Sequence, residues 1–478
     1  MDLAELLAGI ASVKQQIKLT GISLDSRDIK AGHVFFALAG EQQHGLKFSQ
    51  QVQVAGAVAI IYDPKGADNV MDTLTIPTIA VENLAHKCGE IAARFYAYPS
   101  RCLNVIGITG TNGKTSCSQF LAQVLPDTAV MGTLGWGVLG DLQQTNNTTV
   151  DALSTQSILA KCVGQSIHTV AMEVSSHGLA QGRVQGVDFK GAIFTNLSQD
   201  HLDYHHTMEA YFLAKLGLFT SPNLQYAVVN LDDIYAERVL AAIAADVQVL
   251  TFSLKIPASL QATNIKYSLK GMRCDLYWQQ QVYILEVPLL AEFNLQNSLA
   301  VLAVLLAEGF TIQQGLQKLA ILKPIAGRMT CLTAEKKPLV VVDYAHTPDA
   351  LQQALVALKK HCAGKLSVVF GCGGNRDKDK RHQMGLIAVD YADEVIVTND
   401  NPRFEEPQKI INDICSELES QNYQVIVDRA AAIKHSIEQS QYGDIVLIAG
   451  KGHENYQDIK GFKQPFSDIE SVKELLAA

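Results

Sequence analysis

Short apolar runs separated by polar turns or amphipathic stretches extend along most of the chain, and their arrangement divides it into three regions. Up to about residue 85 the runs are rich in β-branched and aromatic residues, as in a small α/β module. From about residue 102 to 325 apolar strand candidates alternate with helical stretches. The clearest strand candidates of these two regions are residues 34–38, 57–62, 78–81, 103–108, 169–174, 191–195 and 227–230.

The alternation restarts at about residue 326, with expected strands at 339–342, 366–370, 394–398, 424–427 and 444–449. Continuous apolar runs suit parallel strands that are buried on both faces, and ligands of such sheets bind at the carboxyl ends of the strands. Polar clusters follow Phe370, Thr398 and Ala449, which places them at those ends. The pattern predicts an α/β protein of three domains, with the last one a doubly wound, Rossmann-like sheet. The expected domains are residues 1–87, 88–325 and 326–478.

Composition narrows the class of protein. A chain of 478 residues is too long for one ordinary core, and 48% hydrophobic with 18% charged residues is the profile of a soluble globular protein. A net charge of −9 without a basic stripe argues against a nucleic-acid binder. The stretch from Leu299 to Ala307 is too short to span a membrane, and the first residues lack the basic start of a signal peptide. Nine scattered cysteines indicate reduced thiols, so we expect a cytoplasmic protein.

The clearest chemical motif is Gly110-Thr-Asn-Gly-Lys-Thr115, between the strand ending at Thr109 and a helical stretch that starts at Lys114. Glycines let backbone N–H groups face phosphate oxygens, and the helix N-terminus adds partial positive charge. Lys114 can reach the outer phosphates, and Thr115 can ligate Mg²⁺. The alternative is a glycine-rich turn with an exposed lysine. The strand before the motif and the helix after it favour a phosphate loop.

Acidic and histidine side chains follow the next predicted strands. Glu173 ends one strand, and a cluster with His201, Asp203, His205 and His206 follows another. Oxygen ligands such as Thr115 and Glu173, joined by one imidazole, suit Mg²⁺ that bridges ATP phosphates. A zinc site in the histidine cluster is the main alternative, but an ATP loop upstream makes a hydrolytic zinc unnecessary.

The segment from Ile106 to Ser116 resembles the ATP loop of the Mur ligases, which share it with folylpolyglutamate synthases. Those enzymes form amide bonds by activating a carboxylate with ATP. The resemblance extends from Leu24 to Glu454, with the motifs in family order. It implies a UDP-substrate-binding N-terminal domain, a central P-loop domain and a Rossmann-like C-terminal domain that binds an amino acid and closes over the site.

The resemblance also implies the residues that bind ATP and Mg²⁺. ATP is expected to contact Gly110, Thr111, Asn112, Gly113, Lys114, Thr115, Ser116, Asn294, Asn297, Arg328 and Asp343. The implied metal ligands are Thr115, Glu173, His201 and a carbamylated Lys215, and the catalytic set is Lys114, Glu173, His201, Lys215 and Arg328. Asp343 could instead cap the helix that begins near Pro348. Ala291 stands where the family usually has glycine, which costs stability if that backbone needs a positive φ.

The first region resembles the UDP-binding domain of the enzymes that add the third residue and the terminal dipeptide. Its motifs are Leu24-Asp-Ser-Arg27 and Gly40-Glu-Gln-Gln-His-Gly45. The implied contacts to the UDP-linked muramoyl dipeptide are Leu24, Ser26, Glu41, Gln42, Gln43, Asn147, Thr148, Thr149, Ser175, Gln181 and Arg183.

Three polar loops indicate which amino acid is added. Diaminopimelate ends in a second amino-acid head, which requires a planar cation for its carboxylate and acceptors for its ammonium. Arg376 and Arg403 can supply the planar cation, and Asp400 and Glu454 can supply the acceptors. The implied set is Arg376, Asp400, Asn401, Pro402, Arg403, Gly450 and Glu454. In the family Asp-Asn-Pro-Arg marks diaminopimelate-adding enzymes, whereas lysine-adding relatives replace the Arg.

The resemblance thus implies a monomeric ligase that uses ATP and Mg²⁺ to join meso-diaminopimelate to UDP-N-acetylmuramoyl-L-alanyl-D-glutamate through an acyl phosphate, in peptidoglycan precursor synthesis. The nearest alternatives are a lysine-adding muramoyl ligase, against which Arg403 argues, and a folate-polyglutamylating ligase, against which the first domain argues. Another P-loop amide ligase is the broader class. A P-loop switch or nucleic-acid motor is disfavoured by the acidic charge balance.

Overall fold

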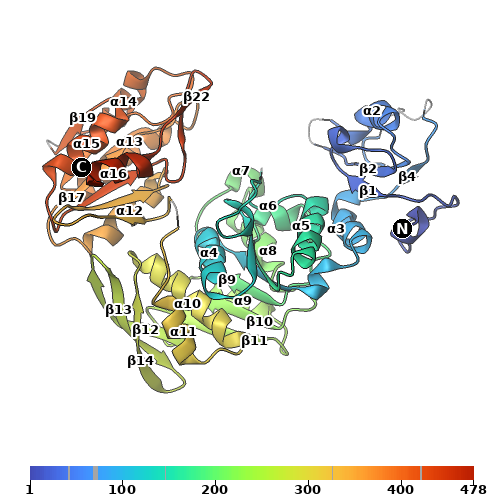
Figure 1. The fold of residues 1–478 in the computed structure, drawn as a ribbon, viewed down its shortest axis with the longest axis horizontal. Coiled ribbons are helices and arrows are strands. Elements are labelled where there is room, and N and C mark those ends of the chain that lie inside the picture. Colours follow the sequence, from blue (N-terminus) through green and yellow to red (C-terminus); the bar gives the residue numbers. More distant parts are fainter. Residues whose placement is uncertain (41–42, 68–73, 146, 326, 420–421, 478) are drawn as a thin grey trace. The chain divides into compact units, whose positions relative to one another are not determined.

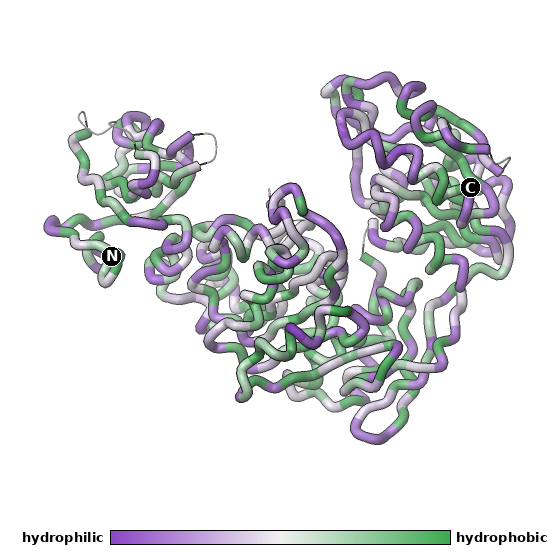
Figure 2. The backbone as a smooth tube through the Cα atoms, turned by 180° about the vertical axis from the view of Figure 1, so that it is seen from behind, coloured by the Kyte–Doolittle hydropathy of each residue, from purple (hydrophilic) through white to green (hydrophobic). Residues whose placement is uncertain are grey.

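The computed structural model describes residues 1–40, 43–67, 74–145, 147–325, 327–419 and 422–477 (Figure 1). Contacts divide the chain into two compact units. One comprises Met1–Gln261 with Leu299–Ile312, and the other comprises Ala262–Ser298 with Gln313–Ala478. Hydrophobic residues run along the central strands, while hydrophilic residues gather in the loops (Figure 2). None of the helices in the described part of the chain has the length and apolar character that crossing a bilayer requires.

The chain begins with a small parallel sheet in the order β1-β2-β3-β4. Its elements are α1 (Leu3–Leu6), β1 (Gly21–Ser23), β2 (His33–Ala37), α2 (Ser49–Val54), β3 (Ala59–Tyr62), β4 (Thr78–Ala80) and α3 (Leu84–Phe95). Helix α3 buries Leu84, Ile91 and Ala92 in a core that also contains Val34 and Ile61. The three strands predicted in this region are confirmed.

The central sheet has ten strands in the order β14-β13-β12-β11-β10-β9-β5-β8-β6-β7. They are β5 (Asn104–Thr109), β6 (Thr128–Gly132), β7 (Gly135–Val138), β8 (Thr169–Glu173), β9 (Gly191–Phe194), β10 (Tyr226–Asn230), β11 (Gln248–Ser253), β12 (Leu260–Ser268), β13 (Gly271–Trp278) and β14 (Gln281–Val287). The run from β11 to β6 is parallel, and β8, β9 and β10 are buried at every position. This confirms the prediction of parallel strands covered on both faces.

Helices alternate with the strands of this region along the chain. They are α4 (Lys114–Val124), α5 (Ala152–Gly164), α6 (Ser176–Ala180), α7 (Leu202–His205), α8 (Met208–Leu216), α9 (Ala236–Ala242), α10 (Glu292–Ala307) and α11 (Ile312–Leu319). Helix α4 follows β5 directly, α6 follows β8, and α7 follows β9. The loops between these pairs therefore meet at the carboxyl ends of adjacent strands.

The C-terminal sheet has six strands in the order β15-β16-β20-β17-β18-β19, parallel except for the edge strand β15. They are β15 (Thr330–Leu332), β16 (Leu339–Asp343), β17 (Leu366–Phe370), β18 (Glu394–Val397), β19 (Tyr423–Val425) and β20 (Ile445–Ala449). Alternate strand residues point to opposite faces. Val341, Val368 and Leu447 lie in one core, whereas Val340, Val369 and Val446 lie in the other.

Three helices cover the first of these faces and two cover the second. They are α12 (Pro348–Lys359), α13 (Asp379–Tyr391) and α14 (Pro407–Cys415), and opposite them α15 (Arg429–Gln439) and α16 (Asp468–Ala477). A hairpin of β21 (Tyr456–Ile459) and β22 (Phe462–Pro465) follows β20. The strand predicted at 424–427 is misplaced, because β19 is a half-exposed edge strand whose pairing with β18 ends at Val425.

Candidate active site

The predicted phosphate loop lies between a buried strand and a helix, as the sequence indicated. Strand β5 ends at Thr109 and α4 begins at Lys114. Gly110 has a φ of 149°, and a Cβ there would lie 1.9 Å from the Thr195 Oγ1. The Nζ of Lys114 donates to the carbonyl oxygens of Gly110 (2.7 Å) and Thr111 (2.8 Å). The loop thus needs glycine for its close approach to β9, and its lysine is folded back over it.

Glu173 meets this loop from the end of β8, and it is only 1% exposed. Its carboxylate accepts hydrogen bonds from the Thr115 Oγ1 (2.9 Å) and from the backbone N–H (3.0 Å) and hydroxyl (3.1 Å) of Thr133. Burial raises the pKa of Glu173, while the charge of Lys114 and these hydrogen bonds oppose that rise. The structure therefore brings Thr115 and Glu173 together as a pair of oxygen donors.

Lys215 lies in α8 and is 2% exposed. Its Nζ donates to the Gly110 carbonyl oxygen (2.8 Å) and lies 4.6 Å from the centre of the Tyr211 ring. Burial lowers the pKa of Lys215 well below that of a free lysine, and the nearby charge of Lys114 lowers it further against the opposing effect of Asp200. A larger share of this amine is therefore neutral than in a solvated lysine at the same pH.

The histidine cluster is an aromatic group beside α6 and α7. His201 directly precedes α7 and has a φ of 54°. Its ring lies 4.8 Å from the ring of His177, and its Nε2 lies 3.5 Å from a carboxylate oxygen of Asp200. The Nε2 of His205 is hydrogen-bonded to the Ser176 hydroxyl at 2.9 Å. Among the described residues, no three His, Cys, Asp or Glu side chains are grouped so that they could hold a metal ion.

Residues expected to hold the muramoyl dipeptide are linked by hydrogen bonds. Arg183 donates to the Thr149 carbonyl (2.7 Å) and to the Gln181 amide oxygen (2.5 Å and 2.9 Å). The Thr149 hydroxyl in turn donates to the Glu173 carbonyl (2.9 Å) and accepts from the Ser175 N–H (2.9 Å). A chain of hydrogen bonds therefore connects the residues expected to bind the dipeptide to Glu173.

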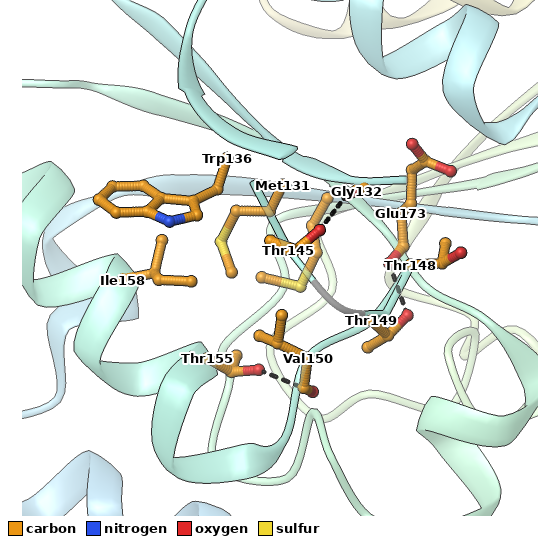
Figure 3. A pocket seen from close by; sticks show the side chains of 11 residues that line it. Met131, Gly132, Trp136, Thr145, Thr148, Thr149, Val150, Thr155, Ile158 and Glu173 are labelled. Atoms are coloured by element: carbon orange, nitrogen blue, oxygen red, sulfur yellow. Dashed lines mark hydrogen bonds between the residues drawn. The ribbon is translucent and has the colours of Figure 1, made fainter. Parts of the chain in front are cut away.

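Thr149 and Glu173 also line a small pocket (Figure 3). Its lining includes Met131, Trp136, Thr148 and Glu173, and the Thr148 hydroxyl bonds the Thr133 hydroxyl at 3.0 Å. Asn147 is exposed.

The residues expected to contact the UDP moiety lie near the first sheet. Leu24 packs against the core of that domain, and Asp25 caps the short 3₁₀ turn Ser26–Asp28. Asp25 also pairs with Arg27 at 2.6 Å, and both side chains remain exposed to solvent. Gln43 is exposed, whereas Glu41 and Gln42 lie outside the described residues.

In the second unit, Asn294 and Asn297 lie in the first turns of α10 and are 5% and 6% exposed. Ala291, just before this helix, has a φ of 73°, and its N–H donates to the His361 Nε2 at 3.1 Å. The position where the family usually has glycine therefore does require a left-handed backbone. The alanine adopts it at a cost of about 1–2 kcal/mol, which its wholly buried methyl group partly offsets.

Asp343 ends β16 and accepts hydrogen bonds from the backbone N–H groups of Met329 (2.7 Å) and Ala345 (2.8 Å). Burial raises its pKa, and the charge of Arg328 opposes this. The guanidinium of Arg328 lies 4.9 Å from the centre of the Tyr344 ring. The cap of α12 is Thr347 rather than Asp343, so the alternative role considered for Asp343 is wrong.

The three loops expected to bind diaminopimelate converge at the carboxyl ends of β17, β18 and β20. The Asn401 side-chain amide donates to the Glu454 Oε2 at 2.8 Å. The Arg403 Nη1 donates to the Gly374 carbonyl at 2.6 Å, and the Gly374 N–H donates to the Asn401 carbonyl at 2.9 Å. A Cβ on Gly450 would lie 2.7 Å from the Asp400 Oδ2.

The other expected residues of these loops differ in exposure. Asp400 and Pro402 are buried, and Arg376 is exposed.

Three buried cations in and around these loops were not singled out in the sequence. Arg381 bonds Glu405 (2.9 Å) and Asp413 (2.7 Å), Arg429 bonds Asp468 (2.7 Å), and Lys451 bonds Glu454 (3.0 Å). Each cationic side chain is 0% exposed. Arg429 also donates to the Ala449 carbonyl at the end of β20.

The β21–β22 hairpin is hydrogen-bonded to the Asp400–Arg403 loop. The Gln457 amide donates to the Asp400 carbonyl (2.9 Å), and the Asp458 N–H donates to the Asn401 Oδ1 (2.9 Å). The Arg403 N–H donates to the Asp458 carbonyl (2.9 Å), and the Lys460 N–H donates to the Arg403 carbonyl (2.7 Å). These bonds support the left-handed backbone of Arg403, which has a φ of 51°.

Three family models match consecutive parts of the chain. The Mur ligase family catalytic domain matches residues 18–96, the Mur ligase middle domain matches 108–305, and the Mur ligase glutamate ligase domain matches 327–452.

Curated relatives extend this likeness over the whole chain. The UDP-N-acetylmuramoyl-L-alanyl-D-glutamate–2,6-diaminopimelate ligase of Pseudomonas aeruginosa is 44% identical over 97% of this chain and 96% of its own. The ligase of the same name from Coxiella burnetii is 42% identical over 96% of both chains. A solved structure with that name has a TM-score of 0.77 and 38% identity, covering 100% of this chain and 99% of its own. The loop, the carboxylate and the three-domain match together show that this chain belongs to the Mur ligase family.

Proposed function

We propose that this chain is the ATP-dependent ligase that joins meso-diaminopimelate to the D-glutamate of UDP-N-acetylmuramoyl-L-alanyl-D-glutamate in peptidoglycan precursor synthesis. The observation that carries the substrate is the convergence of Arg403, Asn401 and Glu454 in one loop cluster. A guanidinium beside carboxylate and amide acceptors matches a ligand head with both a carboxylate and an ammonium. The names of the relatives agree with this substrate.

The phosphate loop and its neighbours support the first step. The D-glutamate carboxylate attacks the γ-phosphate of ATP, a P–O bond breaks, and an acyl phosphate and ADP form. Lys114, above the loop, and Arg328 stabilise the negative charge on the transferring phosphoryl group. In the second step the neutral amine of diaminopimelate attacks the acyl carbon and loses one proton, phosphate leaves with the electron pair of the broken C–O bond, and the proton passes to the released phosphate or to water. Solved relatives with ADP bound share this fold.

The donor set fits Mg²⁺. The hydroxyl of Thr115 and the carboxylate of Glu173 are hard oxygen donors held 2.9 Å apart, as the ion prefers. We propose that they would hold Mg²⁺ together with His201, and that carbamylated Lys215 would hold a second Mg²⁺ that orients the substrate carboxylate. When bound, the ion neutralises phosphate charge. The lowered pKa of Lys215 supports the modification, because only a neutral amine can attack CO₂, releasing a proton and leaving a carbamate.

The remaining expectations extend this proposal. All nine cysteines are free, which is consistent with reduced thiols and with a cytoplasmic enzyme. We propose that the enzyme acts as a monomer. Lys114, Glu173, His201, Lys215 and Arg328 form its catalytic set.

Phosphate release from ATP tests the substrate. The UDP-linked dipeptide is supplied with meso-diaminopimelate or with L-lysine in parallel reactions, and the product mass is measured. We expect release only with diaminopimelate and a product heavier by that residue. Release with lysine alone would show that Arg403 and its loop serve another substrate. Release with neither would leave only the broader class of P-loop amide ligases.

A further inference from the structure

A buried lysine lies within the loop cluster that receives the added amino acid. Lys451 is 0% exposed, and its Nζ donates to the Asn401 Oδ1 (3.0 Å) and to the Glu454 Oε2 (3.0 Å). The Asn401 amide donates to the same Glu454 oxygen (2.8 Å). Asn401 and Glu454 are thereby fixed as one unit through the Oε2 of Glu454, and the Glu454 side chain is still 21% exposed, so its other oxygen can accept from a ligand.

The same lysine belongs to a larger group of charges. The carboxylate of Asp400 interacts electrostatically with the carboxylates of Glu454 and Asp468 and with the cations Arg429 and Lys451. The Nε and Nη2 of Arg429 donate to the two carboxylate oxygens of Asp468 (2.7 Å each), and both side chains are 0% exposed. Arg429 and Lys451 both offset the charge of Asp400, and Lys451 is the one of these two cations that is hydrogen-bonded to Glu454.

We propose that Lys451 is a positioning residue that makes this site select an amino acid whose side chain ends in a zwitterionic head over one that ends in a lone ammonium. This inference rests on the proposed function and deepens it. The cation holds Glu454 in place to accept from the ligand ammonium, and its charge reduces the attraction that Asp400 and Glu454 exert on a bare cation. The carboxylate of the ligand head supplies the negative charge that Arg403 requires.

The competitor is L-lysine, which carries the ammonium but not the second carboxylate. Without the charge of Lys451, two carboxylates face the ligand with less compensation, and a lone ammonium is attracted more strongly. Specificity is a difference between two affinities, so a charge that disfavours the competitor contributes as much as a contact to the substrate. Removing it should therefore change the ratio of the two substrates as well as the activity.

The experiment compares kcat/KM for meso-diaminopimelate and for L-lysine in four proteins. They are the wild type, Lys451→Gln, which keeps hydrogen-bonding capacity without charge, Lys451→Arg, which keeps the charge, and Lys365→Gln, a matched control. Lys365 pairs with Glu394 at the exposed edge of the same domain. Because the Lys451 charge acts within a partly buried site, we expect Lys451→Gln to lower the ratio of kcat/KM for diaminopimelate to kcat/KM for lysine about tenfold to a hundredfold. Lys451→Arg should restore most of the ratio, and Lys365→Gln should leave it unchanged.

Other outcomes are distinguishable. If Lys451→Gln and Lys451→Arg both lose activity with the ratio unchanged, or if neither variant changes the ratio, the inference is overturned. If Lys451→Gln does not fold, Glu454→Gln is tested instead, because it removes the charge of the partner carboxylate. The inference then requires a higher diaminopimelate-to-lysine ratio of kcat/KM than in the wild type. A wild type that prefers lysine overturns the proposed function itself, before any variant is compared.

Discussion

Arg403 has a strained backbone, and its guanidinium would bind both the Gly374 carbonyl and the ligand. Its φ of 51° is supported by bonds to the β21–β22 hairpin, while its Nη1 donates to the Gly374 carbonyl. We expect Arg403→Ala to remove charged hydrogen bonds worth about 1.5–3 kcal/mol each, and to lower kcat/KM for diaminopimelate about tenfold to a hundredfold. Binding of the UDP-linked dipeptide, measured by calorimetry, should remain nearly intact.

The matched control for Arg403→Ala is Arg273→Ala, because Arg273 forms an exposed ion pair with Glu286 in the same unit. It should change neither quantity. Equal losses for diaminopimelate and for the UDP-linked dipeptide in Arg403→Ala would contradict the assignment of Arg403 to the amino-acid site.

Lys215 gives a second prediction at the level of a single residue. Because burial lowers its pKa, its amine is available to form a carbamate with CO₂. Carbon-13 NMR with labelled bicarbonate should show a carbamate signal that Lys215→Arg lacks and Lys190→Arg retains, since Lys190 is paired with Glu308. The signal should weaken as the pH falls through the lowered pKa, because protonation removes the attacking lone pair. A signal that persists in Lys215→Arg would assign the carbamate to another amine.

Individual residues also show where sequence reasoning reaches its limit. Thr115 and Glu173 could be paired from sequence, because a phosphate loop and the end of an adjacent parallel strand meet at one edge of the sheet. Arg381, Arg429 and Lys451 could not be, because a lone Lys or Arg is ordinarily a solvated surface charge. Their hydrogen-bond partners lie between 3 and 50 positions away, a relation that only the folded chain provides.

At the scale of elements, apolar runs located most of the parallel strands, because burial on both faces leaves a continuous signal, but the parallel strands β1, β6 and β11 were not among those predicted. The hairpin of β13 and β14 gave no such signal, since its residues alternate between buried and exposed positions. The β21–β22 hairpin is polar and at most half-buried, yet it holds the Asp400–Arg403 loop. A polar hairpin whose role lies in backbone bonding leaves little trace in hydropathy.

Helix α16 is attached through its first residue, Asp468, which pairs with the first residue of α15, Arg429. Replacing Asp468 with Asn leaves a buried guanidinium without its counter-charge, which should lower the free energy of unfolding by about 3–5 kcal/mol. Chemical denaturation monitored by circular dichroism measures this change. Glu470→Gln, in the same helix but in an exposed pair with Lys473, should cost less than about 1 kcal/mol. Similar costs for the two variants would show that the buried pair contributes no more than a surface one.

At the scale of the whole molecule, the domain boundaries expected from hydropathy do not coincide with the boundaries of the compact units. The apolar alternation restarts near residue 326, and the family models likewise treat residues 108–305 and 327–452 separately. Residues 262–298 nevertheless pack with the C-terminal sheet, because Leu290 and Ala291 lie in its core. Boundaries drawn from sequence follow local composition, whereas compact units follow contacts between distant segments.

His361 joins these segments. Its Nδ1 bonds the Ser268 carbonyl (2.8 Å), which leaves Nε2 as the acceptor for the Ala291 N–H. Burial lowers its pKa, against opposing effects of Ser268 and Glu292. The unfolded chain therefore takes up this proton first, and the stabilisation, complete above about pH 6.5, falls by about 1.4 kcal/mol per pH unit as the pH drops towards the folded-state pKa. Between about pH 8 and about pH 5.5, the free energy of unfolding should therefore fall further in the wild type than in His361→Gln, whose side chain at this position does not take up a proton. Equal losses would mean that His361 keeps its ordinary pKa and that the junction does not depend on its neutral form.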